Sequence, residues 1–280
     1  MPPPGFSPLC DKPLYPAGVR KFAVSDRVVG SFFENWLAGE PSEAKMHAAL
    51  GGSVDGVLAE YRIFPEHALV RTPPHLGDAE AAALPCAGLT AWSAVVKLGG
   101  ISPGRAVLTQ GTGGVSLFAL QFAKMCGARV IATSSSDAKI ERLKSLGADA
   151  TINYKTTPDW GKKARELTGD GVDLVVEVGG VGTLNESIRA TRIGGTIAFI
   201  GVLAGPPPAN SRLPLMVMRQ QRLQGVTVGS VEDLQAMCDA IAQNGMKPVV
   251  DRTFTFDQAR EAFAHMASGA HFGKVAIAVG

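Results

Sequence analysis

The middle of the chain alternates between short, mainly apolar runs and stretches in which apolar positions recur at helical spacing. The runs are residues 106–109 (AVLT), 130–133 (VIAT), 172–178 (VDLVVEV) and 196–200 (TIAFI). Short apolar runs of this kind are typical of strands that are buried on both faces of a parallel sheet. We therefore expect an α/β fold with a doubly wound parallel sheet over this part of the chain.

Helical patterns lie between these runs, as connections between parallel strands require. The expected helices are residues 137–146, 159–168, 185–192 and 231–244, and further strands are expected at 150–153 and 222–228. Strand, helix and parallel strand join by a right-handed crossover, so this region is expected to form one layered domain.

The chain before residue 78 has a different, β-rich pattern. The expected elements there are strands at 27–33, 56–64 and 69–71 and a short helix at 44–50. A helix capped by Asp78 and a second helix at 89–98 then lead into the sheet. Residues 249–279 return to a strand, helix and strand pattern. We expect two domains, the first of them completed by this tail.

A glycine-rich turn, GTGGVS at 111–116, follows the first buried run and opens a helical pattern. Gly111 and Gly113 allow a tight turn and close approach of the backbone to a ligand. The free N–H groups at the helix N-terminus suit a pyrophosphate. Ser116 stands where the dinucleotide fingerprint has a third glycine or an alanine, so an ordinary strand-to-helix turn stays an alternative.

Composition and charge narrow the possible function classes. Of the 280 residues, 46% are apolar and 19% are charged, which is typical of a globular enzyme. The net charge of +2 gives no basic field for nucleic acid, and no apolar run is long enough to cross a bilayer. The opening MPPPGFSPLCDKP lacks the layout of a signal peptide. The four cysteines, at 10, 86, 126 and 238, form no CxxC pair, which favours reduced thiols and a cytoplasmic location.

The residues after the second buried run bear on the choice of cofactor. An acidic residue at this point usually binds the adenosine ribose of NAD, but here three serines, 134–136, come first. Short hydroxyl side chains leave room for the 2′-phosphate of NADP, and Lys139 adds a positive charge nearby. We expect NADP(H). The alternatives are that the serines only cap a helix beside a solvated Lys139, or that Asp137 binds the ribose of NAD.

A series of segments occurs in a consistent order along the chain. They are AEY at 59–61, LPCAGLTAW at 84–92, GTGGVS at 111–116, LGADATINY at 146–154, GVDLVVEVGG at 171–180, GGTIAFIGV at 194–202 and FGKVAIAV at 272–279. Together they resemble the medium-chain dehydrogenase/reductase superfamily, in particular its NADP-dependent, zinc-type-alcohol-dehydrogenase-like and quinone-oxidoreductase-like members. The resemblance covers roughly residues 24–280.

This resemblance implies a domain organisation. An incomplete GroES-like, β-rich catalytic domain is expected at 1–84, a Rossmann dinucleotide-binding domain at 85–246, and a return to the catalytic domain at 247–280. The cofactor is expected in the cleft between the domains. The opening of the chain is shorter than in full-length relatives, so part of the substrate side is expected to be missing.

The resemblance also implies the residues of a cofactor site. Those expected near the pyrophosphate are Gly111, Thr112, Gly113, Gly114, Val115 and Ser116. Those expected near the nicotinamide and its ribose are Thr90, Gly179, Gly180, Gly201, Val202, Leu203, Phe272, Gly273 and Lys274. Near the 2′-phosphate we expect Ser134, Ser135, Lys139 and Tyr154.

Cys86 stands where zinc-dependent relatives have one ligand of the catalytic zinc. Such a site needs three protein ligands and an open position. The partners in those relatives are an upstream Cys followed shortly by Asp or Ser and a Gly-His-Glu turn. Cys10-Asp11 is followed by no Gly-His-Glu turn, and the histidines at 47, 67, 75, 265 and 271 form no ligand motif. We expect no metal, with Cys86 a small buried residue beside the cofactor. No catalytic side chain is assigned; Tyr61 and His47 are candidates, and Glu177 either bonds to the cofactor or ends its strand.

The activity that the resemblance implies is zinc-independent, NADPH-dependent hydride transfer to or from a quinone, enone, aldehyde or alcohol. The short N-terminal region leaves open a catalytically impaired NADP-binding remnant or a redox-sensing protein. A methyltransferase that uses S-adenosylmethionine is a more distant alternative. Residues 223–228 resemble the strand through which relatives dimerise. We expect a homodimer with no nucleic-acid or membrane partner.

Overall fold

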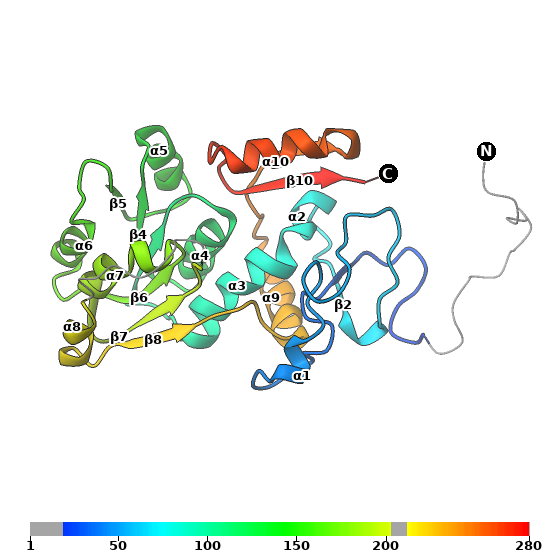
Figure 1. The fold of residues 1–280 in the computed structure, drawn as a ribbon, viewed down its shortest axis with the longest axis horizontal. Helices are drawn as coiled ribbons and strands as arrows, with labels where there is room; N and C mark the ends of the chain where they lie inside the picture. Colours follow the sequence, from blue (N-terminus) through cyan, green and yellow to red (C-terminus); the bar gives the residue numbers. More distant parts are fainter. Residues whose placement is uncertain (1–18, 203–211, 280) are drawn as a thin grey trace, which may run out of the picture.

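The computed structural model describes residues 19–202 and 212–279, so the expected site residue Leu203 lies outside it. Its largest described sheet has six strands in the order β5-β4-β3-β6-β7-β8 and lies at the left in Figure 1. The strands are β3 (Ala106–Gln110), β4 (Arg129–Ser134), β5 (Ala150–Asn153), β6 (Val172–Glu177), β7 (Thr191–Phe199) and β8 (Arg222–Gly225). Each neighbouring pair is parallel, which confirms the predicted fold class. All carboxyl ends therefore meet at one edge, where the order reverses between β3 and β6.

Helices cover both faces of this sheet. They include α4 (Gly114–Met125), α5 (Asp137–Ser145), α6 (Trp160–Thr168), α7 (Leu184–Ala190), α8 (Leu213–Met218) and α9 (Val231–Asn244). Successive strand residues point to opposite faces, so Val107 packs in one apolar cluster and Leu108 in another. The two buried faces explain why the strands read as continuous apolar runs.

A helical stretch leads from the N-terminal part into the sheet. It contains α2 (Asp78–Ala82), the π-helical segment η2 (Leu84–Gly88), α3 (Leu89–Trp92) and a second π-helical segment η3 (Ser93–Leu98). The N-cap of α2 is Gly77, so the expected cap Asp78 is instead the first helical residue. Segments of π-helix are rare and frequently lie at functional sites.

The N-terminal part holds less regular structure than the sequence predicts. It contains β1 (Val28–Gly30), α1 (Glu43–Met46), the 3₁₀ turn η1 (Glu66–Ala68) and β2 (Leu69–Arg71), with β1 and β2 antiparallel. The strand predicted at 56–64 is wrong, since these residues have no ladder partner among the described strands. A β-pattern alone does not form a strand without a neighbour to receive its backbone hydrogen bonds.

The tail forms the expected strand, helix and strand. These are β9 (Val250–Thr255), the turn η5 (Phe256–Gln258), α10 (Ala259–Ala267) and β10 (Lys274–Ala278), and β9 pairs with β10 in parallel. In Figure 1, α10 and β10 lie at the top of the view, to the right of the six-stranded sheet and above the blue and cyan N-terminal part. A bridge between Gly113 and Gly273 joins the tail to the glycine turn.

Two boundaries differ from prediction in ways that affect the site. β7 begins at Thr191, inside the predicted helix 185–192, because Thr191 pairs with Val172. β8 ends at Gly225 rather than at 228, and Val228 then adopts a positive φ of 52°. No described helix is both long and apolar enough to span a membrane.

Candidate cofactor-binding site

A cavity of about 360 Å³ opens at the carboxyl edge of the sheet, where the strand order reverses. The expected site residues that line it are Gly111, Thr112, Gly113, Gly114, Val115, Ser116, Gly179, Gly201 and Val202. Gln110, Val178 and Ile200 complete the described lining. Ligands of doubly wound sheets bind at such a switch point.

The glycine turn leaves the space above it open. Gly111 has a φ of 71°, in the left-handed region, and Gly113 is the extended N-cap residue of α4. A Cβ atom built on Gly111 or Gly113 would meet nothing within 4 Å. Since the first N–H groups of a helix lack partners within it, this open space beside the start of α4 suits a pyrophosphate.

Ser116 explains the departure from the glycine fingerprint. Its side chain is buried, and its Oγ donates a hydrogen bond to the carbonyl oxygen of Gln110 at 2.6 Å. This bond fastens the first turn of α4 to the end of β3. A serine in the third position therefore supports the turn.

Glu177 is a buried carboxylate that organises the neighbouring loop. Its Oε1 accepts hydrogen bonds from the backbone N–H groups of Gly179 (2.8 Å) and Gly180 (2.9 Å) and from Thr183 Oγ1 (2.5 Å). Its Oε2 accepts from Gln110 Nε2 (2.8 Å) and from Ser187 Oγ. Glu177 is therefore not part of the described cavity lining. Its carboxylate fixes the conformation of residues 178–180 by accepting their backbone hydrogen bonds.

The sequence did not predict a role for Gln110, which bonds to both sides of the cofactor cavity. Its side-chain oxygen accepts from Gly179 N at 3.2 Å, while its side-chain nitrogen donates to Glu177 and to Ser187. Because its own carbonyl holds Ser116, Gln110 joins the glycine turn to the loop after β6. The sequence feature that could have indicated this role is the position of Gln110, an amide side chain directly after the buried run 106–109.

The tail closes one side of the glycine turn. Gly273 N donates to Thr112 O at 2.9 Å, and Lys274 N donates to Val249 O at 2.9 Å. Gly273 has a φ of 101°, and a Cβ there would overlap Val249 O. Phe272 is buried, with the Arg142 guanidinium 3.8 Å from its ring centroid. Phe272, Gly273 and Lys274 are thus brought to the glycine turn by the tail.

The residues expected around the 2′-phosphate lie at the end of β4 and the start of α5. Ser134 is buried, Ser135 is half-buried and Tyr154 is exposed. Lys139 Nζ donates to Gly269 O (2.7 Å) and His271 O (3.0 Å), so it is not a free surface lysine. Ser136 caps α5 by accepting from Lys139 N, as one alternative predicted.

Asp137, the alternative ribose ligand, accepts a hydrogen bond from Asn153 Nδ2 at 2.7 Å. Its carboxylate is therefore engaged with the end of β5.

The expectation that Cys86 is buried is wrong. The π-helical turn η2 buries Leu84 and Ala87 and leaves Cys86 exposed. Partial desolvation by its neighbours raises the pKa of the Cys86 thiol, and the positive charge of Lys274 partly opposes this. Thr90 is buried and donates from Oγ1 to Cys86 O at 2.7 Å.

The two candidates for a catalytic side chain, Tyr61 and His47, are both exposed and do not line the cofactor cavity. Within residues 19–202 and 212–279, no group of three or more His, Cys, Asp or Glu residues is placed to hold a metal ion. Cys10 lies outside these ranges.

Several known proteins are similar to this chain in sequence and in fold. Residues 114–243 match the family described as "Zinc-binding dehydrogenase". A "Zinc-type alcohol dehydrogenase-like protein" of Schizosaccharomyces pombe is 44% identical over 267 residues, which is 93% of this chain and 77% of that protein.

Solved structures of dehydrogenases and reductases also have a similar fold. An "NAD-dependent alcohol dehydrogenase" matches with a TM-score of 0.84 and 37% identity, over 94% of this chain and 78% of that one. The 2-octenoyl-CoA carboxylase reductase CinF, solved with NADP and 2-octenoyl-CoA, matches with a TM-score of 0.76 and 26% identity, over 83% and 57% of the two chains.

Proposed function

The chain belongs to the medium-chain dehydrogenase/reductase superfamily and is an oxidoreductase of that type, and we propose that it transfers a hydride between NADP(H) and a quinone, enone, aldehyde or alcohol. The observation that carries the proposal is the open space above Gly111 and Gly113, at the switch point of the sheet and beside the start of α4. In this fold a dinucleotide binds at that point.

We propose that residues 111–116 hold the pyrophosphate and that Gly179, Gly180, Gly201, Val202 and Leu203 border the nicotinamide and its ribose. Thr90, Phe272, Gly273 and Lys274 are proposed to lie at the same end. The nicotinamide supplies the hydride when it is bound. The role of the protein residues is to orient it and to exclude water from the cleft.

We further propose that the reaction needs no zinc. The support is the ligand set, since among the described residues no group of three or more His, Cys, Asp or Glu residues, with or without Cys86, is placed to hold a metal ion. A catalytic zinc requires three protein ligands. The residues present therefore do not fit a catalytic zinc site at Cys86.

The proposed activity is tested by mixing purified protein with NADPH and a panel of quinones, enones and aldehydes. Oxidation of NADPH, followed by its absorbance, is the expected result. A second candidate is an NADP-binding protein without turnover, favoured by the small β1–β2 sheet and by the 91% exposure of Tyr61. Calorimetric NADPH binding without oxidation of NADPH by any panel member would favour that candidate.

The preference for NADP over NAD rests on Ser134, Ser135, Tyr154 and above all Lys139. Lys139→Ala is expected to weaken NADPH binding roughly tenfold and NADH binding much less, because a charge-assisted bond to the 2′-phosphate is lost. Dissociation constants measured by calorimetry for both cofactors check this.

Lys144→Ala is the matched control for that prediction. It removes a lysine from the same helix, where Lys144 pairs with Glu141 at an exposed position. The control should leave both affinities unchanged. An equal loss for NADPH and NADH in Lys139→Ala would mean that Lys139 serves only to fasten Gly269 and His271.

We propose a cytoplasmic homodimer formed through β8. This strand is the last in the sheet and is exposed along its length, with Leu223 37% exposed. An unpaired strand edge invites pairing with a second copy. Light scattering at micromolar concentration should give twice the mass of one chain, and Leu223→Lys should give a monomer. A monomeric wild type would contradict the proposal.

The proposed domain division assigns 1–84 to a partial GroES-like catalytic domain, 85–246 to the Rossmann domain and 247–280 to the return segment. Its support is the change at residue 78 from the β1–β2 part to the helices that enter the large sheet.

A further inference from the structure

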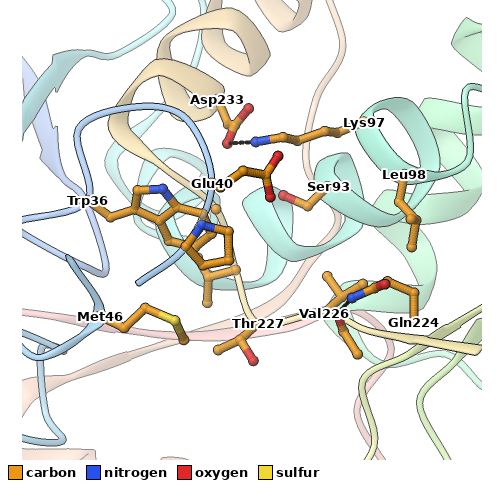
Figure 2. A pocket seen from close by; sticks show the side chains of 14 residues that line it. Trp36, Glu40, Met46, Ser93, Lys97, Leu98, Gln224, Val226, Thr227 and Asp233 are labelled. Carbon is orange, nitrogen blue, oxygen red and sulfur yellow. Dashed lines mark hydrogen bonds and ion pairs between the residues drawn. The ribbon is translucent and has the colours of Figure 1, made fainter. Parts of the chain in front are cut away.

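A second cavity, of about 410 Å³, lies where the N-terminal part meets the end of β8 (Figure 2). Trp36 and Met46 form one wall, Ser93 and Leu98 of η3 form another, and Val226 and Val228 form a third. A volume of this size accepts a small organic molecule. The apolar side chains of these walls are Trp36, Pro41, Met46, Leu98, Val226 and Val228, and polar side chains lie among them.

The second cavity adjoins the cofactor cavity. Val226, which lines the second cavity, donates from its backbone N–H to Phe199 O at 2.9 Å. The next residues after Phe199, Ile200 and Gly201, line the cofactor cavity. Neighbouring strands lie only about 4.8 Å apart. The second cavity is therefore next to the end of the cleft where we propose the nicotinamide.

Ser93 is a buried polar residue in the described lining whose side chain has no hydrogen-bond partner. Its side chain is only 7% exposed, and its Oγ forms no hydrogen bond within the described structure. Thr90, on the same helical stretch, instead bonds to the carbonyl of Cys86. Figure 2 shows Ser93 pointing from its helix toward the side where Glu40 and Trp36 lie. A desolvated hydroxyl without a partner is unfavourable, and a ligand oxygen placed there would satisfy it.

The backbone around this hydroxyl is also unusual. Ser93 begins the π-helical segment η3, and Val228 has a φ of 52° although it is β-branched. Gly229 packs so closely on Ser93 that a Cβ there would lie 2.8 Å from Oγ. Strained backbone of this kind is concentrated at ligand sites. These features occur in the walls of one cavity.

The charges of the cavity disfavour anions. Lys97 is paired with Asp233 at 2.9 Å, so its positive charge is already compensated. Glu40 lines the cavity, is exposed and forms no ion pair within the described structure. Lys45, whose ammonium bonds to the carbonyl oxygens of Ala38 and Glu40, is not part of the lining. The described lining therefore carries an excess negative charge.

We propose that this cavity is the substrate end of the cleft, and that it takes an uncharged, largely apolar alcohol or carbonyl compound whose oxygen bonds to Ser93 Oγ. The inference rests on the proposed function, which it narrows to uncharged substrates. The same charges disfavour carboxylates and acyl-CoA thioesters. Ser93 is a substrate-positioning residue and takes no part in the proton transfer.

Binding without cofactor tests the proposal directly. The probes are 4-fluorobenzyl alcohol and 4-fluorobenzoate, which have the same ring and differ in charge, observed by fluorine NMR with the full chain. The alcohol should bind and the benzoate should not. Ser93→Ala should weaken alcohol binding roughly threefold to tenfold, since one neutral hydrogen bond is lost. Glu40→Gln should make benzoate binding detectable.

Ser145→Ala is the matched control, because Ser145 is an exposed serine whose Oγ bonds within its own helix. Equal binding of both probes would overturn the proposal. So would unchanged alcohol binding in a Ser93→Ala protein whose circular dichroism spectrum matches wild type.

Turnover separates this inference from the proposed function. With 4-fluorobenzaldehyde and NADPH, Ser93→Ala should raise KM and leave kcat nearly unchanged. Crotonyl-CoA should not be reduced, and its reduction at a comparable rate would overturn the assignment of substrate charge. Ser93-dependent binding of the alcohol without NADPH oxidation by any panel compound would support the cavity assignment and reject the proposed function.

Discussion

Gly113→Ala is expected to abolish NADPH binding while leaving the fold of the free protein intact. The backbone of Gly113 has a φ of −73° and a ψ of 170°, a conformation that alanine adopts without strain. The added methyl group meets no protein atom within 4 Å. It would, however, occupy the space that the pyrophosphate needs. We expect an affinity loss of at least about 100-fold, which corresponds to ~2.8 kcal/mol.

The measurement is calorimetric titration with NADPH, together with a thermal unfolding scan. Gly111→Ala is the contrasting variant, since its φ of 71° costs an L-residue about 1–2 kcal/mol and should lower the unfolding temperature. Gly113→Ala should unfold at the wild-type temperature. If it binds NADPH as tightly as wild type, the pyrophosphate does not lie above this turn.

Glu177→Gln is expected to destabilise the protein by about 3 kcal/mol and to weaken NADPH binding as a consequence. The carboxylate is fully buried, and all its described partners are donors: the N–H groups of Gly179 and Gly180, two hydroxyls and the Gln110 amide. A glutamine amide nitrogen would face donors instead of accepting from them. Buried donors that lose their acceptor cost about 1–3 kcal/mol each.

Urea denaturation measures the change in the free energy of unfolding for this variant. Glu141→Gln is the control, because Glu141 pairs with Lys144 at the surface and such pairs contribute about 0–1 kcal/mol. A Glu177→Gln protein as stable as wild type would mean that residues 178–180 hold their shape without the carboxylate.

The two predictions concern two walls of the same cofactor cavity, the glycine turn and the loop after β6. Gln110 holds the first turn of α4 through Ser116 and holds the loop after β6 through Glu177. The glycine turn and that loop therefore keep a fixed separation, and both line the cofactor cavity. A rigid cavity binds a long cofactor with less loss of conformational entropy.

Much of the fold was determined by the sequence alone. The helix at 231–244 and the strands at 69–71 and 150–153 have the predicted bounds, and the other sheet strands overlap theirs. These elements follow from hydrophobic periodicity, which is a local property of the chain. The glycine turn was also predicted from the sequence, because glycines that follow a buried apolar run and precede a helical pattern form a local motif.

Only the tertiary structure determined which side chains meet at the site. Gln110 and Glu177 are 67 residues apart, and Lys139 meets His271 across 132 residues. The segment η2 buries Leu84 and Ala87 and leaves Cys86 exposed, and residues 56–64 have no ladder partner among the described strands. The cavity around Ser93 likewise draws its walls from the N-terminal part, η3 and the end of β8. Periodicity reports which face of an element is buried, but the partner that covers that face is set by contacts distant in the chain.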